Sequence, residues 1–105
     1  MKTSKNTKKD TLSVDEIVGL IQTAILKIED RRYEAAKAIL VRLTKEDQPR
    51  SHIYANVLNA LRRGPGNNSH TYDLTWAAVR FRCQLALREA ARQILQNEQA
   101  FVGVC

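Results

Sequence analysis

Apolar residues recur at helical spacing along most of the chain, and breaks in this pattern divide it into four predicted helices. The first begins at Ser13, which stands three residues before Glu16 as in a capping box. The predicted helices cover residues 13–29, about 31–46, about 51–63, and from Thr71 or Tyr72 to Gln99. Pro49 separates the second from the third, because proline cannot continue a helix. A short apolar tail, residues 101–105, is expected after the last one.

The connection between the first two helices is so short that they must pack antiparallel. We therefore predict an all-α fold of about four helices: an N-terminal antiparallel hairpin, a shorter helix and a long C-terminal helix. The 105 residues, 44% of them hydrophobic, can bury one modest core, so residues 13–105 are expected to form a single domain. Residues 1–12 are lysine-rich and lack apolar periodicity, which is typical of a disordered basic arm.

The hairpin carries small residues where its two helices would approach each other. Arg32-Tyr33-Glu34-Ala35-Ala36, with Ala24 before it and Leu40 after it, resembles one tetratricopeptide-type helical hairpin, and the resemblance covers residues 17–49. The sequence departs from that pattern at three positions: Arg31 replaces the usual glycine, Lys27 a tyrosine and Leu43 a third small residue. The resemblance implies close antiparallel helices and favours protein binding.

The last predicted helix is apolar on two sides. One stripe consists of Trp76, Val79, Cys83, Ala86, Leu87, Ala90 and Ile94. A second stripe lies about 180° away and consists of Leu74, Ala78, Phe81 and Leu85 before it turns basic at Arg88 and Arg92. A helix of this kind needs cover on both sides. The second stripe is therefore a candidate partner or dimer interface, unless another helix of the same chain covers it.

The third predicted helix presents a polar stripe that could face nucleic acid. It consists of His52, Asn56, Asn59, Arg62 and Arg63. Residues 31–63 have helix-turn-helix proportions and a charge of +5 out of a total of +6. Asparagine and arginine can form bidentate pairs with adenine and guanine, but a solvated face explains the same stripe.

The histidines, cysteines and carboxylates of this chain do not occur at spacings typical of a catalytic or metal site. Two cysteines and two histidines show no metal-ligand spacing, and Cys83 reads as a small buried hydrophobe. Glu29, Asp30, Glu46 and Asp47 stand at helix ends, where solvated charge is the ordinary explanation. We expect no enzymatic activity, no cofactor and no metal. Without a signal peptide or a long apolar run, the expected location is cytoplasmic, with no membrane contact.

Two functional hypotheses follow. The first is a small helical protein-interaction module, a regulator or adaptor that binds a protein partner and self-associates as a homodimer. The alternative is a DNA-binding transcriptional regulator that uses the helix-turn-helix-like unit at residues 31–63.

Overall fold

The computed structural model describes residues 12–65 and 75–104, with residues 98–104 described by their backbone alone. This part of the chain contains α2 (Val14–Glu29), α3 (Tyr33–Glu46), the 3₁₀ turn η1 (Gln48–Arg50), α4 (Ser51–Arg63) and α5 (Trp76–Val104), and it contains no strand. The predicted all-α fold, with its hairpin, shorter helix and long C-terminal helix, is confirmed. The predicted basic arm lies outside the described residues, except for Leu12.

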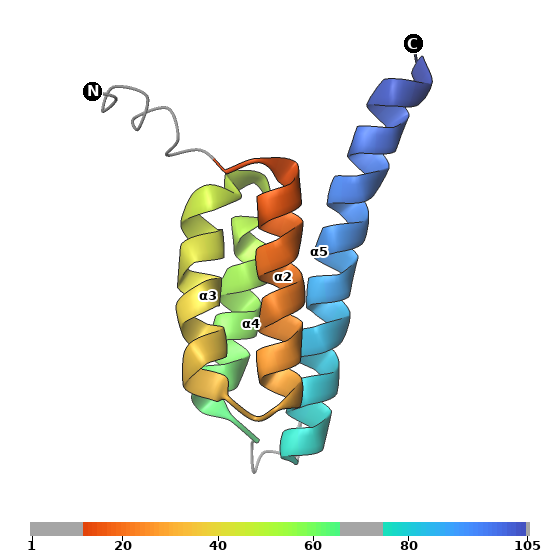
Figure 1. Ribbon diagram of the computed structural model, residues 1–105. Coiled ribbons are helices and arrows are strands. Elements are labelled where there is room, and N and C mark those ends of the chain that lie inside the picture. The colour runs from red at the N-terminus through yellow and green to blue at the C-terminus, as the bar shows by residue number, and fades with distance from the viewer. Residues whose placement is uncertain (1–11, 66–74, 105) are drawn as a thin grey trace, which may run out of the picture.

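The four helices form an up-and-down bundle (Figure 1). Each helix runs opposite to the one before it, and α2 and α4 both pack against α3 on one side and α5 on the other. The end of α5 extends past the other helices. The connections from α2 to α3 and from α3 to α4 are short, so these helices are neighbours both in sequence and in space.

The four apolar stripes meet in one core. The buried apolar residues are Ile21, Ala24, Ile28, Ala36, Leu40, Leu43, Tyr54, Val57, Leu58, Leu61, Val79, Cys83, Leu87, Ala90 and Ile94. Ala24 of α2 and Ala36 of α3, two of the small residues noted in the predicted hairpin, are fully buried in this core. Of the first apolar stripe predicted for the last helix, Val79, Cys83, Leu87, Ala90 and Ile94 are buried and Ala86 is half-buried, whereas Trp76 is 38% exposed at the edge of the bundle.

Local hydrogen bonds set both ends of α2. The Glu16 amide donates to Ser13 Oγ and the Ser13 amide donates to Glu16 Oε1, so the predicted capping box is present. At the other end, the Arg31 amide donates to the Ile28 carbonyl and the Arg32 amide to that of Lys27. These two bonds, with a left-handed φ of 63° at Arg31, form a Schellman motif. For this reason α3 begins at Tyr33, two residues later than predicted.

The ends of α5 also differ from the prediction. The predicted start at Thr71 or Tyr72 lies outside the described residues. In the structure α5 begins at Trp76, after Thr75, whose hydroxyl accepts a hydrogen bond from the Ala78 amide as a capping residue does. The helix then continues to Val104 instead of ending at Gln99, so residues 101–104 of the expected apolar tail are helical. Gly103 lies within the helix, and an internal glycine lowers helix stability without having to end it.

Trp76 connects the start of α5 to the rest of the bundle. Its ring stacks on that of Tyr33, with centroids 4.5 Å apart. The Tyr33 hydroxyl accepts a hydrogen bond from Arg80 Nη1 at 3.0 Å. Gly64 also lies against this ring: it has a φ of 68°, and a Cβ placed there would come within 3.0 Å of the indole. Glycine is therefore required at the end of α4, both for its backbone conformation and for the close approach of Trp76.

Candidate interaction surface

The side of α5 that faces away from the core carries a continuous row of residues. Ala78, Phe81, Leu85, Arg88, Arg92 and Leu95 follow one another at alternating spacings of three and four, and we call this row the outer face of α5. Such spacing keeps all six residues on one line along a helix, as in the seam of a coiled coil.

Buried hydrogen bonds help to orient α5. Gln84 is 8% exposed, and its Nε2 donates to the Ile25 carbonyl at 3.3 Å and to Glu29 Oε1 at 2.8 Å. A buried amide needs such partners, so these bonds favour the rotation of α5 that directs Gln84 toward α2. With this rotation, Cys83 and Leu87 enter the core and the outer face is directed away from it.

Large apolar side chains on the outer face are exposed. Phe81 is 59% exposed and Leu85 is 52% exposed, whereas Ala78 is half-buried. Leu74, the remaining member of the predicted stripe, lies outside the described residues. No helix in the described part of the chain covers Phe81 or Leu85.

The apolar surface extends beyond the residues predicted from sequence. Leu95 is 46% exposed on α5, and Leu26 is 63% exposed on the neighbouring helix α2. Both line an open groove between the two helices, whose other lining residues are Gln22, Ile25, Arg88, Ala91 and Arg92. Leu95 continues the seam spacing past the two arginines, a signal that the sequence contains. Leu26 does not belong to the apolar stripe of α2. It becomes part of this surface only because α5 packs beside α2.

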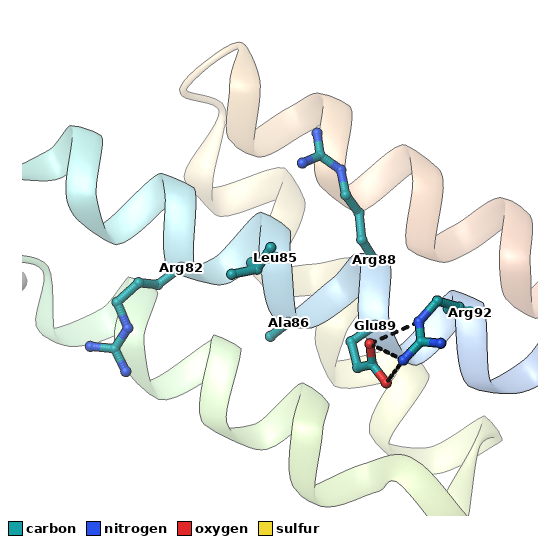
Figure 2. Close-up of a pocket in the computed structure, with 6 residues that line it drawn as sticks. All are labelled: Arg82, Leu85, Ala86, Arg88, Glu89 and Arg92. Atoms are coloured by element: carbon teal, nitrogen blue, oxygen red, sulfur yellow. Dashed lines mark hydrogen bonds and ion pairs between the residues drawn. The ribbon is translucent and has the colours of Figure 1, made fainter.

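Charged residues border the apolar ones (Figure 2). Arg82 and Arg88 leave α5 on opposite sides, toward α4 and toward α2. Glu89 accepts hydrogen bonds from Arg92 Nε at 3.0 Å and from Arg92 Nη2 at 2.8 Å. These bonds hold the pKa of Glu89 below its ordinary value. The outer face therefore combines an apolar half, toward the start of α5, with a basic half formed by Arg88 and Arg92, and Glu89 flanks this basic half.

The predicted nucleic-acid face lies on α4 and is exposed. The five side chains of His52, Asn56, Asn59, Arg62 and Arg63 are all accessible. However, α3 and α4 run alongside each other in opposite directions (Figure 1). In a helix-turn-helix the two helices cross at about 90–120°, which lets the second enter the major groove. The stripe is therefore exposed, but α3 and α4 lack the crossing angle with which a helix-turn-helix places its second helix in the major groove.

One expectation about acidic residues is wrong. Asp47 is 3% exposed instead of solvated. Its Oδ2 accepts hydrogen bonds from Arg50 Nε at 2.8 Å and from the hydroxyl of the fully buried Tyr54 at 2.5 Å. Burial, together with the neighbouring charge of Asp47, raises the pKa of Tyr54 above its ordinary range. This cluster joins the end of α3 to α4, which gives it a structural role, and a buried aspartate one residue past a helix could not be recognised from its sequence position.

Three further findings concern function. Among residues 12–65 and 75–97, no histidines, cysteines and carboxylates gather in a group that could hold a metal ion. Within the described helices, none has the length and apolar character needed to cross a membrane. No protein family, curated protein or solved structure was found to match this chain. The tetratricopeptide resemblance therefore stays a prediction.

Proposed function

We propose that this chain is a small helical protein-interaction module, a regulator or adaptor, that binds protein through the outer face of α5 and self-associates. One observation carries the proposal. Six large apolar side chains are exposed in the described part of the chain, and four of them, Leu26, Phe81, Leu85 and Leu95, lie on or beside the outer face of α5. Scattered exposed leucines are ordinary on a soluble protein, whereas large apolar side chains gathered on one side of the molecule and flanked by charges are typical of a binding site.

The composition of the surface supports the same proposal. Aromatic residues and arginine are enriched in protein interfaces, and lysine is depleted. The outer face contains Phe81, two leucines and two arginines, and no lysine. A cytoplasmic location remains part of the proposal, as expected from the sequence.

The test is the solution mass of the protein by light scattering, at low and at high salt, with and without random duplex DNA. We expect a salt-resistant assembly that is indifferent to DNA, because an apolar interface is not weakened by salt. The double variant F81E/L85E should lose this assembly. Val41 on α3 is also exposed, at 37%, and lies outside this surface, so V41E is the matched control and should leave the mass unchanged.

The second candidate is DNA binding through His52, Asn56, Asn59, Arg62 and Arg63, and the exposure of all five side chains favours it. If it is correct, the protein binds duplex DNA. R62A/R63A then weakens binding, and the slope of log K against log salt concentration falls by the amount expected for the loss of about two phosphate contacts. A chain that binds DNA in this way, and whose mass and binding are unaffected by F81E/L85E, would overturn the interaction-module proposal.

A further inference from the structure

We propose that a second copy of this chain occupies the outer face of α5, with the two α5 helices antiparallel and with Arg82 of each copy beside Glu89 of the other. The inference rests on the proposed function and names the partner. It starts from the asymmetry of the face: Phe81 and Leu85 form its apolar half, and Arg88 and Arg92 form its basic half.

Charge decides the relative direction of the two helices. In a parallel pair, each residue of the seam meets its own counterpart, so Arg88 would meet Arg88 and Arg92 would meet Arg92. Like charges at such short range oppose association. An antiparallel pair avoids these contacts in the register with Arg82 beside Glu89, where the apolar half of each copy meets the basic half of the other. Leu85 then lies against the stem of Arg88, and the guanidinium of Arg92 can stack on the ring of Phe81.

Charge also selects the register of the antiparallel pair. Arg82 and Glu89 are seven residues apart and therefore flank the seam on the same side, where both border the hollow shown in Figure 2. In an antiparallel pair, the numbers of any two residues that face each other add up to the same sum. Moving from one register to the next changes this sum by seven. One register places Arg82 against Arg82, the next places Arg82 against Glu89, and the third places Glu89 against Glu89. Only the middle register brings opposite charges together, and it does so twice because the dimer is symmetric.

The same register accounts for the exposure of Leu26. This residue shares a groove with Arg88, Arg92 and Leu95, next to the basic half of the outer face. In the chosen register, the apolar half of the second copy lies along that half, so Leu26 comes close to Phe81 of the second copy. The buried area then includes α2 as well as α5, which enlarges an interface that a single helix pair would leave narrow.

The charge pairing is tested by reversal. The dissociation constant of the dimer is measured by sedimentation for the natural chain, R82E, E89R and R82E/E89R. Each single reversal places two like-charged pairs in the interface and should weaken the dimer about tenfold. The double reversal restores both pairs and should return the constant to within about threefold of the natural value. A double variant as weak as the single ones, or single variants without effect, would overturn the pairing.

The register is tested by cross-linking. Single variants R82C and E89C are made in a C105S background, and a short thiol-to-thiol cross-linker is added to each alone and to their mixture. Cys83 is buried and stays in place, and the C105S protein is the background control. We expect the strongest linkage in the mixture, because the mixed dimer keeps one Arg82–Glu89 pair and places the two cysteines side by side. Each variant alone lacks these pairs, and in the proposed register its identical positions are about 10 Å further apart along the helix axis. A mixture that forms no linked dimer, or no more than either variant alone, would overturn this register.

The outcomes separate this inference from the proposed function. A dimer that depends on Phe81 and Leu85 but links in another register overturns the pairing and leaves the interaction surface in place. A natural chain that stays monomeric at every concentration overturns the second copy as occupant. Salt-sensitive DNA binding that ignores F81E/L85E overturns the proposed function itself.

Discussion

At the scale of single residues, the most consequential side chain in the core region is Asp47. It accepts hydrogen bonds from Arg50 and Tyr54 and is nearly inaccessible to water. A buried carboxylate is tolerated when its partners satisfy it, and removing it leaves those partners unsatisfied in its place.

We therefore expect D47A to lower the free energy of unfolding by about 2 to 3 kcal/mol, as measured by urea denaturation. Y54F removes one of the two hydrogen bonds and should cost about 1 kcal/mol. Asp30 is an exposed aspartate at the end of α2, so D30N is the control and should change the free energy of unfolding by less than about 0.5 kcal/mol. Equal effects for D47A and D30N would show that Asp47 is solvated.

At the scale of elements, the hairpin of α2 and α3 depends on the turn between them. Arg31 adopts a left-handed conformation, with a φ of 63°, at the position of the Schellman motif that favours glycine. For a residue with a Cβ, this conformation costs about 1 kcal/mol or more in free energy. The departure from the tetratricopeptide pattern at Arg31 thus coincides with a strained backbone position.

We expect R31G to raise the free energy of unfolding by about 0.5 to 1 kcal/mol, because glycine adopts a positive φ without strain. The control is R32G. Arg32 has a φ of −94°, which suits any residue, so glycine there only increases the entropy of the unfolded chain and should lower stability by about 0.5 to 1 kcal/mol. Thermal denaturation of the two variants measures the difference. A loss of stability in both would contradict the strain at Arg31.

At the scale of the whole molecule, the four helices share one hydrophobic core. Each helix contributes buried residues to it, and Trp76 connects the start of α5 to Tyr33 and Gly64. A small domain with a single core unfolds in one cooperative transition.

The fluorescence of Trp76, the one tryptophan of the chain, should therefore change at the same urea concentration as the far-ultraviolet circular dichroism. Both are recorded at one fixed protein concentration, because self-association makes stability depend on concentration. D47A should move both midpoints together, although Asp47 and Trp76 lie in different parts of the bundle. An earlier fluorescence transition would mean that the start of α5 separates before the core unfolds.

Local patterns in the chain were sufficient to predict the helices, most of their boundaries and the buried stripe of α5. Capping at Ser13 and the helix break at Pro49 depend on neighbouring residues, and the apolar stripes reflect a period of 3.6 that each helix carries alone. The second stripe of α5 was also visible as a candidate interface, although the stripe predicted from the sequence did not include Leu95 or Leu26.

Which of these faces is covered depends on how the helices pack, and local patterns do not contain that information. The exposure of Phe81 and Leu85, the position of Leu26 beside Leu95 and the burial of Asp47 all depend on helices that are distant in sequence. Burial is a property of two surfaces in contact, and a local pattern describes only one of them. The α5 stripe that contains Cys83 enters the core because α2 and α4 lie over it, and the outer face stays open because the described bundle has no further helix to place there.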